Sequence, residues 1–206
     1  AKHGDQVGSQ KMIADGALKQ PKPEVMFGMH VIAGMPSGNI FYKDAAILNS
    51  ADEFRIKIIG QQVHASMPWA GQDPIVSSAA VITNMQTLIS RYSNLTKGMA
   101  VVSVGQISGG TVSNIIPNEV NMQGTIRTNQ EDIRQNILKL LPEMVKNTAL
   151  ANNTKAEVEL SSYAPVTYND KTLTQLMAKS LESAAGASQV HVMGNNASAS
   201  EDFAYY

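Results

Sequence analysis

Two short segments about fifty residues apart each place one polar side chain in a loop suited to chemistry. Residues 60–68 carry His64, and residues 109–117 carry Asn114. Glycine and proline punctuate both segments, and each adjoins a strand-like run. Loops held by a rigid scaffold are where binding and catalytic groups usually lie. The two segments together predict a substrate-contacting module of a hydrolase.

Both residues also have a purely structural interpretation. A loop histidine such as His64 often hydrogen-bonds to the backbone and does nothing more. Asn114 could be a turn residue, because asparagine tolerates left-handed backbone and bonds its own main chain. Taken singly, neither residue decides between the two interpretations.

His30 lies near the end of Val25–Ile32, an almost wholly apolar run. This pattern is typical of a strand buried on both faces of a parallel sheet. Ligands of open α/β sheets bind at the carboxyl ends of strands, and histidine is the commonest metal ligand. His30 is therefore a candidate metal ligand. The alternative is a histidine that is hydrogen-bonded in the core.

The remaining candidates are weaker. Arg127 ends an alternating run and could clamp a carboxylate in a bidentate manner, although most such arginines are solvated. Glu201 and its neighbour Asp202 lie in a polar loop, where adjacent acids are usually solvated. His3 and His191 lack supporting context, and we expect both at the surface.

Composition excludes several classes of protein. The 206 residues fit one or two domains, and 43% hydrophobic with 16% charged residues is normal for a folded core. With 16 basic and 17 acidic residues, the chain has no excess charge with which to hold nucleic acid. No run approaches the roughly 20 apolar residues of a membrane helix. The absence of cysteine excludes disulfides and thiolate metal sites.

The middle of the chain alternates strands and helices. Their order is strand, helix, strand, strand, helix, strand, which is the split βαβ or ferredoxin-like arrangement. Asp73 and Asn129 are the expected N-caps of the two helices. We therefore expect an α+β domain at residues 50–162, inserted into an α/β domain that residues 1–49 and 163–206 represent in part. The expected elements are strands at 54–59, 99–107, 119–127 and 156–160, and helices at 73–92 and 129–145.

Six motifs occur in a fixed order along essentially the whole chain. They are Phe27-Gly28-Met29-His30, Gly60-x-x-x-His64-Ala65-Ser66-x-Pro68, Asp73-Pro74-Ile75, Gly109-Gly110-Thr111-x-x-Asn114-Ile115-Ile116-Pro117, Gly124-Thr125-Ile126-Arg127-Thr128 and Ser200-Glu201-Asp202-Phe203. This set closely resembles the metal-dependent amidohydrolase and peptidase family of hippurate hydrolases, aminoacylases, indoleacetyl-amino-acid hydrolases and glutamate carboxypeptidases. The hippurate-hydrolase-like branch is the nearest match.

The resemblance implies a catalytic α/β domain with two divalent metal ions, zinc or manganese, and an inserted ferredoxin-like lid that forms a homodimer. It implies that His30 is a metal ligand and that His64 polarises the scissile carbonyl, often in the partner subunit's site. Asn114 and Arg127 then orient the substrate, an N-acyl amino acid or small peptide. The resemblance implies that Glu201 lies beside the metal site and supports a ligand without binding the metal itself.

Three metal-binding segments of the family have no counterpart in the sequence. They are a His/Asp or Cys/His segment upstream, a Glu-Glu pair just before the position of Ala1, and a final histidine after the Ser-Glu-Asp-Phe segment. A catalytic zinc needs about three protein ligands. We therefore expect a fragment of an enzyme that lacks a complete active site and does not retain the metals.

Two other interpretations stay open. The chain could be a self-standing dimerisation or binding module without catalysis. A metal site rebuilt from His3 and His191 is disfavoured, because neither has ligand-like spacing to His30. Compartment, metal identity and acyl preference are not determined by the sequence.

Overall fold

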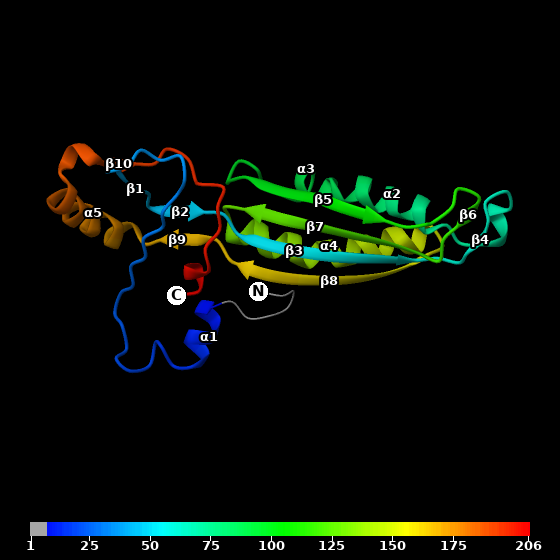
Figure 1. Ribbon diagram of the computed structural model, residues 1–206, viewed down its shortest axis with the longest axis horizontal. Helices are drawn as coiled ribbons and strands as arrows, with labels where there is room; N and C mark the ends of the chain where they lie inside the picture. The colour runs from blue at the N-terminus through cyan, green and yellow to red at the C-terminus, as the bar shows by residue number, and fades with distance from the viewer. Residues whose placement is uncertain (1–7) are drawn as a thin grey trace. The chain divides into compact units, whose positions relative to one another are not determined.

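The computed structural model describes residues 8–206. It divides into two compact units (Figure 1). One unit, called the lid here, is Ala51–Ser162, and the other, called the outer unit, combines Ala1–Ser50 with Tyr163–Tyr206.

A four-stranded sheet with helices on one face forms the lid. Its strand order is β5-β7-β3-β8. Neighbours β3 and β7 are antiparallel, as are β5 and β7, and Figure 1 shows β8 running opposite to β3. This is the predicted ferredoxin-like arrangement, so the expected fold class is confirmed. The elements are β3 (Ala51–Ile59), α2 (Pro74–Met85), α3 (Thr87–Ser90), β5 (Ala100–Ser108), β7 (Glu119–Thr128), α4 (Glu131–Ala151) and β8 (Lys155–Ala164).

Alternation along the strands separates the core from the open face of the sheet. In β3, Phe54, Ile56 and Ile58 are fully buried, whereas Glu53 and Arg55, on either side of Phe54, are exposed. This follows from the two-residue period of a strand, which sends successive side chains to opposite faces. Helix α4 packs against the buried face of the sheet through one apolar stripe, which consists of Ile133, Ile137, Leu141, Val145 and Ala149.

The two lid helices begin differently. Asp73 caps α2 as predicted, since its Oδ1 accepts from the backbone N–H groups of Ile75 at 2.8 Å and Val76 at 3.2 Å. The expected cap of the second helix is wrong. The N-cap of α4 is Gln130, and Asn129 Oδ1 instead accepts from Met99 N at 2.9 Å, where it tethers the start of β5.

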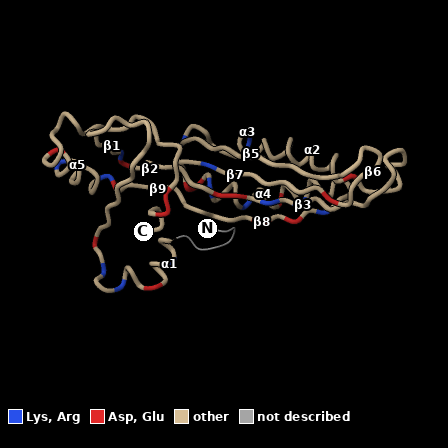
Figure 2. The backbone as a smooth tube through the Cα atoms, viewed as in Figure 1, with Lys and Arg blue, Asp and Glu red and all other residues tan. Residues whose placement is uncertain are grey.

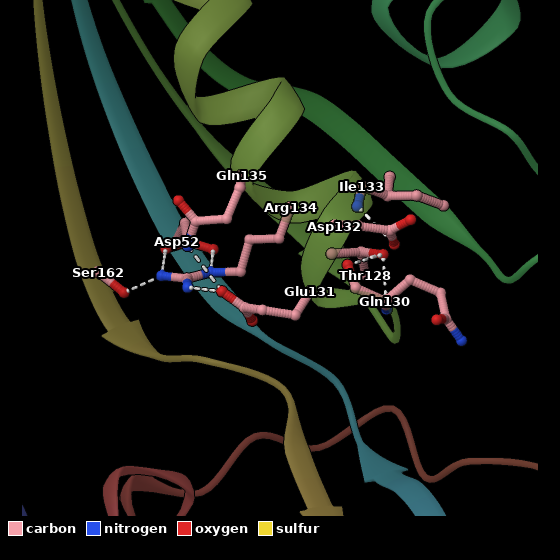
Figure 3. A network of polar contacts seen from close by, with 9 residues as sticks. All are labelled: Asp52, Thr128, Gln130, Glu131, Asp132, Ile133, Arg134, Gln135 and Ser162. Atoms are coloured by element: carbon pink, nitrogen blue, oxygen red, sulfur yellow. Dashed lines mark hydrogen bonds and ion pairs between the residues drawn. The ribbon is translucent and has the colours of Figure 1, made fainter.

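A buried ion pair lies at the start of α4 (Figure 3). Arg134 donates two hydrogen bonds to the fully buried Asp52, from Nε to Oδ2 at 2.8 Å and from Nη2 to Oδ1 at 2.7 Å. Its Nη1 donates to Glu131 at 2.7 Å, and Nη2 also reaches Ser162 Oγ. Burial by itself lowers the pKa of the Arg134 guanidinium, but its bonds to Asp52 and Glu131 outweigh this and raise it. The network joins the first and last strands of the lid.

The outer unit contains short elements. Strand β1 (Ile40–Tyr42) is parallel to β10 (Val190–Val192), and β2 (Ala45–Leu48) is antiparallel to β9 (Thr167–Asn169). Asp170 caps α5 through a bond from Leu173 N at 2.8 Å. None of the helices at residues 8–206 has the length and apolar character needed to cross a membrane. The helical elements of this unit are α1 (Gly8–Ala14), α5 (Lys171–Ala185), η2 (Ala187–Gln189) and η3 (Asp202–Tyr205).

The buried strand expected at Val25–Ile32 is wrong. This run has no strand, and Met29 and Val31 are 93% and 95% exposed. A strand buried on both faces requires neighbouring strands and covering helices. The described residues supply neither for this run, so its apolar side chains face outward.

Candidate functional site

The two predicted loops meet at one end of the lid, called the tip here (Figure 1). Strand β4 (Val63–His64) pairs with β6 (Ile115–Ile116), so that His64 lies opposite Ile115. The backbone N–H of Ala65 donates to Asn114 O at 2.9 Å. His64 and Asn114 are thus brought onto one small surface, although fifty positions separate them in the sequence.

The loop after His64 has a defined conformation. Gln61 and Gln72 form an antiparallel bridge, with backbone bonds of 2.9 and 3.1 Å. A Cβ at Gly60 would overlap Gln72 O, and one at Gly71 would lie 2.7 Å from Gln61 O. Glycine is therefore required on both sides of the bridge. Between them, η1 (Pro68–Ala70) carries Trp69, which is 81% exposed.

The His64 ring is exposed and makes its contacts through Nδ1. Ser66 Oγ lies 2.8 Å from this nitrogen, and the backbone N–H of Ser66 donates to it at 3.2 Å. Residues 60–72 and 98–118 contain no Asp, Glu, Lys or Arg, and in Figure 2 the outermost loops beyond β6 are tan. His64 is the one ionisable side chain in these two stretches.

Arg127 lies far from the tip. It occupies the opposite end of β7 from Glu119, eight residues away, or about 27 Å at 3.3–3.4 Å per residue. Its register partner is Val101. Nη1 donates weakly to Ile126 O at 3.4 Å, and no carboxylate among residues 8–206 forms an ion pair with it. One chain therefore does not bring Arg127 together with His64 and Asn114.

A second cluster lies within the outer unit. His30 Nδ1 is 3.1 Å from Glu201 Oε2, and both side chains are partly exposed. Phe203 packs against Gly28, where an added Cβ would lie 3.1 Å from the ring. Two motifs 170 residues apart therefore meet. Next to them, the backbone N–H of Ser9 holds the pKa of the Asp202 carboxyl below its usual value.

The residues present do not by themselves fit a two-metal centre. Residues 8–206 contain no group of three or more His, Cys, Asp or Glu side chains that could hold a metal ion. His30 and Glu201 supply at most one ligand and one supporting carboxylate. The described part of the chain thus lacks the ligand number that a catalytic zinc requires.

His191 is not the plain surface residue we expected. Its Nε2 lies 2.6 Å from Asn39 Oδ1, and its ring packs against Phe41 with centroids 5.3 Å apart. The side chain is half-buried and joins β10 to the start of β1. His3 lies outside the described residues.

Sequence reasoning missed Ser66 and the Asp52–Arg134 pair. Both left a signal. Ser66 follows His64 by two positions in a short turn, which is within reach of the ring. Asp52 occupies the inward register of Phe54 and Ile56, so its alternation predicts a buried acid that needs a cation.

Known proteins resemble this chain in sequence and in fold. Residues 48–153 match the family model of the peptidase dimerisation domain of M20 peptidases. The chain is 32% identical over 200 residues to N-acetyl-L-cysteine deacetylase of Bacillus subtilis, covering 97% of this chain and 46% of the relative. It spans about half the length of the curated relatives it matches.

Two crystal structures share the fold at 28% identity. One is a Staphylococcus aureus protein described as an aminohydrolase, with a TM-score of 0.87 over 97% of this chain and 50% of that one. The other is a dinuclear metal-binding M20 peptidase from Bacillus subtilis, with a TM-score of 0.74 over 100% of this chain and 50% of that one. The family model, which covers just over half of the chain, and the relative at 32% identity lead to one assignment: the chain belongs to the M20 peptidase family and contains its dimerisation domain.

Proposed function

We propose that the chain is the lid-containing part of a two-metal amidohydrolase that hydrolyses the amide bond of N-acyl amino acids or small peptides. The observation that carries the proposal is the tip, where an exposed imidazole and an exposed amide lie together on paired loops. The name of the Bacillus subtilis relative, a deacetylase of an N-acyl amino acid, supports the same reaction class.

In this proposal His64 donates a hydrogen bond to the scissile carbonyl oxygen. Negative charge develops on this oxygen as the carbonyl is attacked, and a preorganised donor stabilises it. Asn114 contributes an amide that orients the substrate. Arg127 binds the free carboxylate of the amino acid in a bidentate manner.

Distance favours a site shared by two copies of the chain. Arg127 lies about 27 Å along β7 from the end at which β4 and β6 lie. A small N-acyl amino acid cannot span this separation. We infer that His64 and Asn114 of one copy act with Arg127 of another, so that the active form is a homodimer.

The two edges of the lid sheet differ in a way that indicates the dimer surface. Edge strand β5 contains no charged residue and exposes the apolar side chains of Val101 and Ile107. Edge strand β8 carries Lys155, Glu157 and Glu159. Charged edge strands resist pairing with other chains, whereas a neutral edge offers unpaired backbone groups. We therefore propose β5 as the pairing edge. Val101→Lys combined with Ile107→Lys should convert the dimer to monomer in light scattering, and an unchanged mass would count against this edge.

His30 is the proposed metal ligand, with Glu201 behind it. A metal-binding histidine commonly donates its other ring N–H to a carboxylate, which leaves the second nitrogen free for the metal. The 3.1 Å contact between His30 Nδ1 and Glu201 fits this arrangement. Zinc or manganese would act as the Lewis acid in the complete enzyme, and the other ligands come from outside the described cluster.

The function of His64 is tested in the full-length enzyme. His64→Ala should lower kcat by about 10²–10³-fold, the cost of removing one oxyanion donor. His64→Gln keeps an N–H donor and should recover part of the loss. Unchanged turnover in His64→Ala would remove the proposed role. Elemental analysis of the 206-residue chain should find close to zero zinc and manganese, and two metals per chain would contradict the proposed lack of ligands.

A second candidate is a dimerisation or binding module without catalysis. The lid has a complete core of its own, while residues 8–206 contain no three-ligand metal cluster. Expression of the complete coding sequence separates the two candidates. Hydrolysis of N-acyl amino acids supports the enzyme, whereas a stable dimer that is inactive with added zinc or manganese favours the module.

A further inference from the structure

The contacts of the His64 ring determine which of its nitrogens carries the proton. A backbone N–H can only donate, so the bond from Ser66 N requires a lone pair on Nδ1. The Ser66 hydroxyl, 2.8 Å from the same atom, can then only donate as well. A neutral imidazole has one proton, and with Nδ1 as acceptor that proton is on Nε2.

Among the described residues, the hydrogen-bond contacts of the His64 ring come from Ser66 alone. In many catalytic sites a carboxylate orients the histidine by accepting from Nδ1–H. Residues 60–72 and 98–118 contain no carboxylate, and the Ser66 contacts have the opposite polarity. The backbone around the ring is fixed by the bond from Met67 N to His64 O at 2.9 Å.

We propose that Ser66 is a positioning residue that holds His64 as the Nε2–H tautomer and aims this N–H outward. No bond to Nε2 is present among the described residues, so this donor is free for a ligand oxygen. Ser66 contacts the substrate only through His64. The inference rests on the proposed function of His64 as carbonyl donor and adds the residue that sets its polarity.

Nitrogen NMR of the 206-residue chain tests the proposal without activity. The chain has four histidines, so ¹⁵N-histidine labelling gives four assignable rings. At about pH 8, above the ordinary histidine pKa of about 6.5, His64 should show a protonated Nε2 and a hydrogen-bonded Nδ1. A protonated Nδ1 in the wild-type chain would overturn the proposal.

Three variants isolate the hydroxyl. Ser66→Ala keeps the backbone N–H but removes the Oγ donor, so the Nδ1 resonance should move toward that of a free acceptor and the minor tautomer should increase. Ser66→Thr keeps a hydroxyl and should restore the wild-type resonances. Ser183→Ala on α5 is the control and should leave the His64 ring unchanged. Identical His64 spectra in wild type and Ser66→Ala would also overturn the proposal.

Kinetics of the full-length enzyme distinguish the positioning role of Ser66 from the proposed carbonyl-donor role of His64. Ser66→Ala should lower kcat about 10–100-fold, as for loss of a group that orients a catalytic ligand, with KM within about twofold. Ser66→Thr should recover most of kcat. If His64→Ala is inactive while Ser66→Ala is fully active, the positioning role fails and the proposed function stands. If His64→Ala is fully active, the carbonyl-donor role fails, and the NMR result still decides the tautomer.

Discussion

The lid and the outer unit use apolar residues differently. In the lid, alternating strands and helical stripes meet in one core whose central side chains, such as Phe54 and Ile137, are fully buried. In the outer unit, the apolar run Val25–Ile32 stays largely exposed. The strands of this unit form two separate two-stranded sheets. Apolar sequence becomes core only where neighbouring elements are present to cover it.

The largest expected change in stability comes from a pair of matched side-chain truncations, one in each unit. Phe54→Ala should cost about 3–5 kcal/mol of lid stability, because it empties a fully buried site. Phe27→Ala removes a ring that is 48% exposed and should cost less than about 1 kcal/mol. Hydrogen exchange of the slowest amides in each unit of the full chain measures both. Equal losses would abolish the contrast.

Asp52→Asn tests whether the lid also depends on its buried charges. The substitution leaves the buried Arg134 cation without its carboxylate partner and should destabilise the lid by about 3 kcal/mol. Glu131→Gln removes the more exposed partner of the same guanidinium and should cost under about 1 kcal/mol. Urea denaturation of both variants gives the comparison. If Asp52→Asn left the free energy of unfolding unchanged, the Asp52–Arg134 pair would contribute little to the stability of the lid.

Gly124→Ala probes the packing of the sheet and should have a smaller effect. Gly124 lies opposite Phe54, and an added Cβ would overlap the Phe54 ring and Ser103 O. Overpacking of this kind costs about 1–3 kcal/mol. Gly105→Ala, in the neighbouring strand, meets no atom within 4 Å and serves as the control. The two variants should differ in their urea midpoints, and matching midpoints would show that the ring moves away freely.

The smallest effect is expected on the solvated face of the lid. The bond from Lys57 at 2.7 Å, aided by Asn121, holds the pKa of the Glu119 carboxyl below its ordinary value. A depressed carboxyl pKa stabilises the fold above the unfolded pKa, and this contribution is lost as pH falls through the folded value. NMR titration should find the Glu119 midpoint below that of an unpaired glutamate, and Lys57→Met should raise it. A wild-type midpoint no lower than that of the Lys57→Met variant would contradict the pairing.

Local patterns predicted most of the lid. The strand alternation of residues 54–59 and 119–127 and the Asp73 cap follow from neighbours in the sequence, which explains their success. The failures depend on distant residues. Asn129 accepts a hydrogen bond from Met99, and His191 hydrogen-bonds to Asn39. The run Val25–Ile32 lacks neighbouring strands among the described residues. The spatial meeting of His64 with Asn114 also required the β4–β6 pairing.

The exposed indole of Trp69 gives the tip an optical signature. It is the only tryptophan in the chain and lies five residues after His64 on η1. Its emission on excitation at the red edge of protein absorption therefore comes from this loop alone. Any molecule that covers the tip, a second copy or a ligand, should shift that emission to shorter wavelength and shield it from a dissolved quencher. Events confined to the outer unit should leave it unchanged.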